Sequence, residues 1–177
     1  MSRRPLHIVT VSSEVHPFAK TGGLADVAGA LPRALARLGH KCTVILPGFR
    51  KIDHKKFNVT DTGQAVTCAI EETSHRINIL KSDHLPGITA LLIDHPAFSD
   101  RPELYGTAAG DYPDNAFRFA LFCRAAVELI ETLEQPPDVV HCHDWQTGLI
   151  PALIECASTR KPFWENTRTV FTIHNLA

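Results

Sequence analysis

Hydrophobic residues along the chain follow two alternating patterns, and this alternation predicts the fold. A short, nearly continuous apolar run with β-branched residues at 6–11 is typical of a strand buried on both faces. From Leu24 to Leu38 apolar residues recur every three or four positions, which predicts a helix with one apolar stripe. Pro32 lies inside this helix and should bend it. A second buried strand at 42–46 completes an expected right-handed strand–helix–strand unit.

The middle of the chain predicts an antiparallel meander. Residues 49–64 are polar and irregular, and the basic cluster within them is expected to be part of a solvated loop. Three strands are expected at 65–70, 76–80 and 88–93, with short turns at 73–74 and 84–87. Short turns favour antiparallel pairing, so this meander is expected at a sheet edge or as an insertion.

The last third of the chain returns to alternating helices and strands. A long loop at 95–113 is of a length that is usually functional or disordered. A helix from about 114 to 133 follows, with Asp111 or Asp114 as its N-cap. Further elements are expected at 139–142 (strand), 148–155 (helix) and 169–173 (strand). The whole pattern predicts an α/β fold, a Rossmann-like, doubly wound, mostly parallel sheet, and residues 1–177 are expected to form one domain or an incomplete one.

Composition excludes several classes of protein. The formal net charge of the 177 residues is -1, which gives no reason to expect binding to nucleic acid or to an anionic membrane. Five scattered cysteines, an odd number, favour reduced thiols over a disulfide framework. No secretory signal and no uncharged run long enough to cross a bilayer is found, so a cytoplasmic protein is expected.

The segment 20–27 is the strongest candidate for binding chemistry. Gly22 and Gly23 follow the first strand and open the first helix, where glycine lets a ligand approach the backbone closely. Helix N-terminal amides carry partial positive charge, and Lys20 adds a full charge. This combination suits a phosphate or diphosphate; the alternative is a plain strand-to-helix turn with a solvated lysine.

Two further polar clusters follow later strands. They lie at 143–146 and 174–175, and the first cluster, at 12–20, follows the first strand. Ligands of doubly wound sheets bind off the carboxyl ends of the strands, so one crevice is expected to hold all three. Asp144 is either an N-cap or a carboxylate for a sugar hydroxyl, and Trp145 either packs or stacks on a sugar. His174 and Asn175 either satisfy local backbone groups or bind hydroxyls.

Other common sites are absent from the sequence or incomplete. The Rossmann Gly-x-Gly-x-x-Gly fingerprint, the P-loop and the Gly-x-Ser-x-Gly nucleophile elbow are not found. His141 and His143 would point to the same face of a strand and could share a zinc ion. The run lacks the later carboxylate and final histidine of metallohydrolases, so no metal is the favoured interpretation and zinc the alternative.

Together these segments resemble the bacterial glycogen synthases and plant starch synthases. The matching segments, in the order of that family, are Ser13–Pro17, Lys20–Val27, Gly29–Pro32, Tyr112–Phe119, His141–Leu149 and Phe171–Ala177. The resemblance implies a two-domain glycosyltransferase of the GT-B fold, of which 1–177 would be the incomplete N-terminal Rossmann-like domain and the C-terminal nucleotide-binding domain would lie outside this chain. It also implies transfer of glucose from ADP-glucose to the non-reducing end of an α-1,4-glucan such as glycogen, with retention and without a metal or cofactor.

The resemblance also implies roles for individual residues. The sugar nucleotide would contact Lys20, Gly22 and Gly23. The donor glucose would be held by Asn175 and by His174, the catalytic histidine near the reacting carbon. The acceptor glucan would lie towards Glu14, Asp26, Tyr112 and Asp144.

The missing second half sets what is expected of this chain by itself. It is expected to bind ADP-glucose weakly at best and not to elongate glucan. The choice between ADP- and UDP-glucose stays open, because the base pocket would lie outside the chain. Two rival classes also stay open: a non-catalytic glucan-binding or regulatory fragment, and a zinc hydrolase using His141 and His143.

Overall fold

The computed structural model describes residues 4–158 and 161–175. The basic start of the chain at 1–3 and the last two residues of the final matching segment, Leu176 and Ala177, lie outside the described residues.

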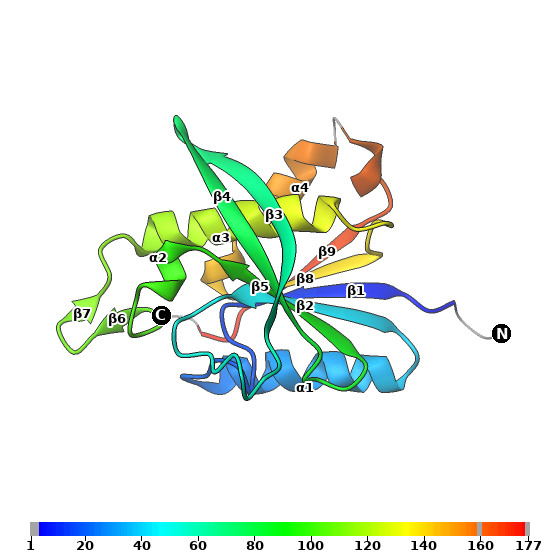
Figure 1. Cartoon of the computed structure of the whole chain (residues 1–177). Coiled ribbons are helices and arrows are strands. Elements are labelled where there is room, and N and C mark those ends of the chain that lie inside the picture. The colour runs from blue at the N-terminus through cyan, green and yellow to red at the C-terminus, as the bar shows by residue number, and fades with distance from the viewer. Residues whose placement is uncertain (1–3, 159–160, 176–177) are drawn as a thin grey trace.

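Seven strands form one mixed sheet in the order β3-β4-β5-β2-β1-β8-β9 (Figure 1). The strands β5, β2, β1, β8 and β9 are parallel to one another, and β3 and β4 add an antiparallel edge. Their bounds are β1 His7–Val11, β2 Lys41–Pro47, β3 Thr60–Ile70, β4 Thr73–Ser82, β5 Ile88–Asp94, β8 Val139–His143 and β9 Arg168–Thr172. The predicted α/β fold, with its meander at a sheet edge, is confirmed.

Helices cover both faces of this sheet. In Figure 1, α1 (Gly23–Arg37) lies on one face, and α3 (Asn115–Glu131) and α4 (Ile150–Ser158) lie on the other. All five residues of β1 are buried between these layers, as its continuous apolar run predicts. Shorter elements complete the chain: α2 Pro96–Ser99, the hairpin of β6 Gly106–Thr107 and β7 Gly110–Asp111, and the 3-10 turns η1 Trp145–Thr147 and η2 Pro162–Trp164. Among the described helices, none combines the length and the apolar character that crossing a bilayer requires.

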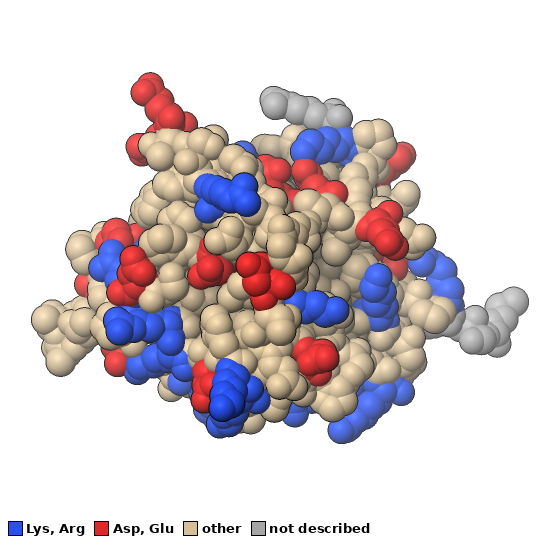
Figure 2. Space-filling view, in the orientation of Figure 1, with Lys and Arg blue, Asp and Glu red and all other residues tan. Residues whose placement is uncertain are grey.

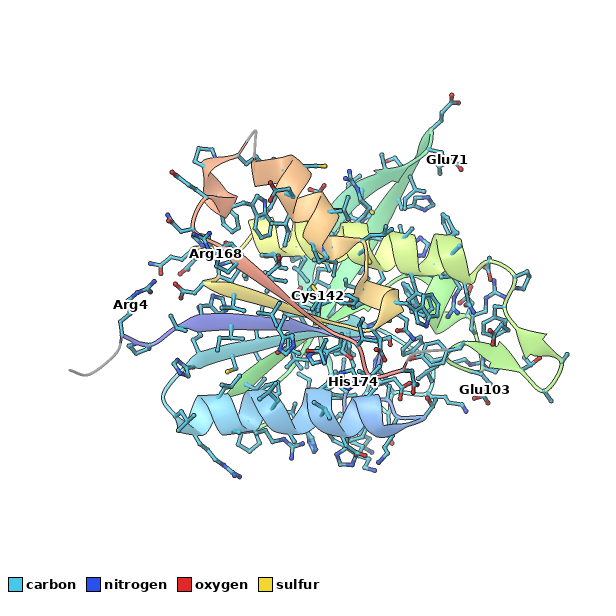
Figure 3. All side chains as sticks on the ribbon, turned by 180° about the vertical axis from the view of Figure 1, so that it is seen from behind. Arg4, Glu71, Glu103, Cys142, Arg168 and His174 are labelled. Atoms are coloured by element: carbon cyan, nitrogen blue, oxygen red, sulfur yellow. The ribbon has the colours of Figure 1, made fainter. Side chains whose placement is uncertain are left out.

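The antiparallel edge differs from the prediction in two details. The strand β3 begins at Thr60, inside the segment expected to be a loop, because a bulge between Asp61 and Ala65 lets this polar stretch pair with β4. The turn of the hairpin is at Glu71–Glu72 and not at 73–74, which pair with β3 instead. Glu71 takes a positive φ of 54° there, and Figure 3 shows it at the tip of the projecting hairpin.

The long loop at 95–113 is ordered around one buried arginine. Arg118 of α3 donates from Nε to the carbonyl of Ala97 (2.7 Å) and from Nη1 to the carbonyl of Leu104 (3.0 Å). Its side chain is fully buried, so these bonds form in a low-dielectric environment and hold the loop firmly. Asp114 occupies the N-cap position of α3, but its side chain makes no capping bond; Oδ2 accepts from Arg101 instead (2.6 Å).

The order of the strands creates a switch point between β1 and β8. From β1 the chain moves to β2 on one side, and it later returns to place β8 on the other side. A crevice forms outside the carboxyl ends of the strands at such a point, and ligands of open α/β sheets bind there. Figure 3 shows His174 at this end of the sheet, opposite Arg4 and Arg168. Over the face shown in Figure 2, acidic and basic side chains are intermixed, in line with the small net charge.

Candidate functional site

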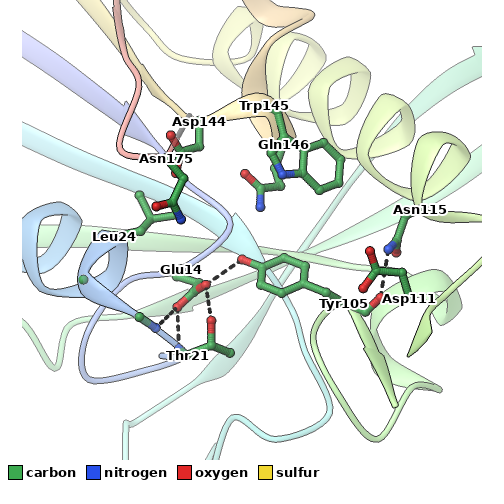
Figure 4. A pocket seen from close by; sticks show the side chains of 12 residues that line it. Glu14, Thr21, Leu24, Tyr105, Asp111, Asn115, Asp144, Trp145, Gln146 and Asn175 are labelled. Carbon is green, nitrogen blue, oxygen red and sulfur yellow. Dashed lines mark hydrogen bonds between the residues drawn. The ribbon is translucent and has the colours of Figure 1, made fainter. Parts of the chain in front are cut away.

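A cavity of ≈ 320 Å³ lies at this switch point (Figure 4). Each of the three polar clusters contributes to its wall, as the positions at the strand ends predict. The lining residues are Glu14, Thr21, Gly22, Gly23, Leu24, Tyr105, Asp111, Asn115, Asp144, Trp145, Gln146 and Asn175. Of the residues to which the resemblance assigns a role, Lys20, Asp26, Tyr112 and His174 are not part of this lining.

The two glycines of the turn face open space. A Cβ added to Gly22 or Gly23 would meet no protein atom within 4 Å. Gly22 has an extended backbone with φ -147°, which any residue adopts. Neither packing nor backbone conformation therefore requires glycine at these two positions. The remaining physical reason for glycine is the close approach of a ligand to the backbone.

The turn before the glycines is held against α1 by a close backbone contact. The amide of His16 donates to the carbonyl of Ala25 (3.0 Å). A Cβ at Gly29 would lie only 2.4 Å from the carbonyl oxygen of His16. Glycine at position 29 therefore allows the loop that carries Glu14 to lie directly on the helix.

The carboxylate of Glu14 binds backbone amides of the glycine turn, where the sequence predicts a phosphate. Its carboxylate is buried and accepts bonds from the amides of Thr21 (2.5 Å) and Gly22 (3.2 Å) and from Oγ1 of Thr21 (2.6 Å) (Figure 4). The backbone nest of the turn is thus filled by a carboxylate of the protein itself. The amides left for a ligand are those of the first turn of α1, which no side chain caps.

Tyr105 completes the contacts of this carboxylate, and no pattern in the sequence pointed to this residue. Its hydroxyl donates to Oε1 of Glu14 (2.8 Å), so the Ser13 hydroxyl, at 2.8 Å, donates to Tyr105. Burial raises the pKa of Tyr105, and the charge of Glu14 adds to this effect, so Tyr105 remains a protonated donor. Tyr105 therefore links the long loop to the glycine turn.

Tyr112, the tyrosine that the resemblance favoured, lies outside the cavity. Its ring lies 4.9 Å from the guanidinium of Arg101 and 5.0 Å from that of Arg118. Its hydroxyl accepts from the amide of Glu103 at 3.3 Å. In this structure Tyr112 stabilises the loop.

Lys20 and Asp26 form an ion pair beside the cavity. Nζ of Lys20 lies 2.7 Å from each carboxylate oxygen of Asp26, which is in the first turn of α1. Both side chains are about half exposed (45% and 55%). Exposed pairs of this kind contribute only about 0–1 kcal/mol, so the ammonium group can exchange this carboxylate for another anion.

Asp144 is held in a strained backbone conformation at the cavity wall. Its φ of 58° and ψ of 178° lie in a region that is occupied almost only by glycine. It stands at the N-cap of η1, but its carboxylate makes no capping bond there. Instead Oδ1 accepts from the backbone amide of His174 (2.5 Å). The buried carboxylate thus ties the end of β8 to the segment after β9.

Trp145, the next residue, has a partly free face. It lines the cavity with 59% of its surface exposed. One contact is an edge-on approach to Phe119, with ring centroids 5.1 Å apart. Trp145 therefore packs on one side and has an exposed aromatic surface on the other, and its stacking on a sugar stays a prediction.

The histidines considered as zinc ligands bind neighbouring side chains. Nε2 of His141 lies 2.7 Å from Oγ1 of Thr172, and Nδ1 of His143 lies 2.8 Å from Nε2 of His174. Burial, together with the neighbouring His141 and His174, lowers the pKa of His143 to about 3, so His143 is neutral at pH 7. Within the described part of the chain, no three His, Cys, Asp or Glu side chains are arranged to hold a metal ion.

Comparison with known proteins places this chain in a family. The family model for the starch synthase catalytic domain matches residues 7–177 of this chain. The chain is 42% identical to glycogen synthase 2 of Geobacter sulfurreducens and 44% identical to glycogen synthase of Koribacter versatilis, each over 97% of this chain and 35% of the relative. It is also similar to the catalytic domain of starch synthase IV from Arabidopsis thaliana bound to ADP and acarbose (TM-score 0.86, 31% identity, 97% of this chain and 34% of that one). The chain thus spans about a third of the length of these relatives.

Proposed function

The chain belongs to the starch synthase catalytic domain family, and from this premise we propose that it is the N-terminal part of a retaining glucosyltransferase. The proposed reaction transfers glucose from ADP-glucose to the non-reducing end of an α-1,4-glucan such as glycogen. The solved starch synthase IV binds ADP and acarbose, which supports a nucleotide diphosphate and an oligosaccharide as the ligand classes. The second half of the longer relatives would supply the base pocket and further diphosphate contacts.

The observation that carries this proposal is the open space beside the Cα atoms of Gly22 and Gly23. Both residues line the cavity at the switch point, and neither is required by packing or by φ. The amides left free beside them belong to the first turn of a 15-residue helix. A diphosphate is the ligand that this geometry favours, because the helix dipole and the uncapped amides attract negative charge.

Lys20 is proposed to reach the diphosphate by leaving Asp26. The departing nucleoside diphosphate gains negative charge as the glycosidic bond of the donor breaks. A cation and oriented amides already in place stabilise that charge without reorganising solvent, and one such contact typically contributes about 10²–10³ in rate. The exposed pair with Asp26 costs little to open, so it keeps Lys20 extended near the turn until an anion arrives.

The opposite wall of the cavity is proposed to hold sugar. Asn175 offers an amide donor and acceptor, and Trp145 offers an aromatic surface; both line the cavity. Asp144 holds the amide of His174, the proposed catalytic histidine, and so sets its position relative to Asn175. Glu14 and Asp144 reach the cavity, whereas Asp26 and Tyr112 would contact only a glucan that extends beyond it.

Titrations of the ¹⁵N-labelled 177-residue chain followed by NMR test the proposal. Added ADP-glucose is expected to shift the amide signals of Gly22 and Gly23, and added maltoheptaose those of Trp145 and Asn175. Lys20→Met is expected to weaken the ADP-glucose shifts, because it removes the ammonium group. Lys41→Met is the matched control, since Lys41 starts β2 at the opposite, amino end of the strands.

Each outcome bears on one part of the proposal. Shifts confined to residues outside the cavity would contradict the diphosphate site, as would equal effects of the two lysine variants. Shifts with maltoheptaose but none with ADP-glucose would favour a non-catalytic glucan-binding function. Incorporation of radiolabelled glucose into glucan by this chain alone would contradict the proposal that a second half is needed.

A further inference from the structure

Three histidine rings form a row, and the middle ring is inaccessible to solvent. The ring centroids of His141 and His143 are 4.1 Å apart, and those of His143 and His174 are 5.2 Å apart with nearly parallel planes (21°). His143 has no exposed surface. Nδ1 of His143 and Nε2 of His174 are 2.8 Å apart, a distance at which one of the two nitrogens donates a proton to the other.

The donor follows from the surroundings of His143. A neutral imidazole carries one proton on its two nitrogens. Within the described residues, Nε2 of His143 is buried and has no hydrogen-bond partner. A proton on Nε2 would leave a buried N–H without an acceptor, which folded proteins rarely contain. A proton on Nδ1 instead donates directly to His174.

We propose that His143 is a positioning residue that donates from Nδ1 to Nε2 of His174 and thereby holds His174 in its Nδ1–H tautomer. Because Nε2 of His174 accepts this bond, the proton of the neutral His174 ring must be on Nδ1. Among the described residues no acceptor contacts that Nδ1. It is therefore a donor available to a ligand hydroxyl or to water.

The same residue is held a second time through its backbone. The amide of His174 donates to Asp144, the residue directly after His143. The end of β8 thus fixes both the main chain and the ring of His174. If the proposed function holds, this gives the donor glucose an imidazole of fixed orientation and fixed proton position, although the tautomer itself does not depend on that function.

Long-range ¹H–¹⁵N correlation spectra of the full 177-residue chain, labelled in its histidines, test the inference at pH 7.5 without any ligand. The two ring nitrogens of each histidine give separate signals that report which one is protonated. His143 and His174 are both expected as single Nδ1–H tautomers. An Nε2–H tautomer for His174 in the wild-type chain would overturn the inference, whatever the result of the ADP-glucose titration.

Two variants separate this role from simple packing. His143→Leu keeps a buried apolar side chain but removes the donor, so His174 is expected to change to a mixture with Nε2–H present. His141→Leu is the matched control, because it changes the neighbour on the other side of His143 and leaves the His143–His174 bond in place. His143→Asn, whose amide nitrogen can replace Nδ1, is expected to restore the Nδ1–H tautomer. An unchanged His174 in a folded His143→Leu chain would refute the role; if that variant does not fold, the wild-type spectrum still decides.

Discussion

Replacing Gly29 by alanine tests the packing that positions the glycine turn. An added Cβ would lie 2.4 Å from the carbonyl oxygen of His16 and 3.3 Å from its carbonyl carbon and its amide nitrogen. These are backbone atoms, so the loop at 12–20 must shift as a unit. Forcing a methyl group into a packed site costs about 1–3 kcal/mol. Alanine in a helix interior returns up to about 1 kcal/mol through backbone entropy.

The shift also threatens a backbone hydrogen bond. The amide of His16 donates to Ala25 at 3.0 Å, and a lost bond of this kind costs about 0.5–1.5 kcal/mol. The balance predicts that Gly29→Ala lowers the free energy of unfolding by about 1–2 kcal/mol. With a urea m-value of about 2 kcal/mol/M, the midpoint should fall by about 0.5–1 M.

Equilibrium urea denaturation followed by circular dichroism measures this effect. Gly23→Ala is the matched control: it is also in α1, but its Cβ meets no atom within 4 Å, so its stability should stay equal or rise by a few tenths of a kcal/mol. If Gly29→Ala were as stable as Gly23→Ala, the loop would not be held by this contact. The proposed link between α1 and the position of Glu14 would then be wrong.

Two further predictions concern the buried polar groups of the site. Tyr105→Phe removes the donor to Glu14 and should lower the free energy of unfolding, measured by urea denaturation, by about 1–2 kcal/mol. Tyr112→Phe is the control and should cost less, because it loses only one bond of 3.3 Å. Equal losses in the two variants would contradict the assigned bonds. His143 has a pKa of about 3 in the folded chain and about 6.5 when unfolded, so the unfolded chain binds more protons between these values and stability must fall as pH decreases through this window. Its contribution should make the chain about 2 kcal/mol less stable at pH 5 than at pH 7.5, and His143→Leu should flatten this dependence; an unchanged slope would show that His143 is not the group responsible.

The sequence predicts the sheet well because hydrophobic periodicity reports burial directly. The continuous run of β1 and the stripe of α1 are read from residue type alone, and both elements have nearly the predicted bounds. The start of β3 was missed because polar residues at 60–64 join the sheet through a bulge, and their pairing depends on β4 and not on their own pattern. The prediction places the hairpin turn two residues too late, at 73–74, because neither Glu71 nor Glu72 is a typical turn former.

The sequence predicts where the site lies more accurately than it predicts the contacts between its side chains. Residues at the ends of three strands meet because parallel strands have their carboxyl ends at one edge, a rule that needs no side-chain detail. Which partner each polar group takes depends on distances that no local pattern contains. Glu14 filling the turn and the donor from Tyr105, some 90 residues away, are contacts of that kind.

The backbone of Asp144 has a consequence for any attempt to improve this protein. Glycine would adopt φ 58° and ψ 178° without the strain that an aspartate bears, which is of order 1–3 kcal/mol. A screen for heat resistance alone would therefore favour removal of the side chain that fixes the amide of residue 174. At this position the stability of the fold favours glycine, whereas a fixed position of residue 174 requires the carboxylate. The aspartate in this sequence satisfies the second requirement at the expense of the first.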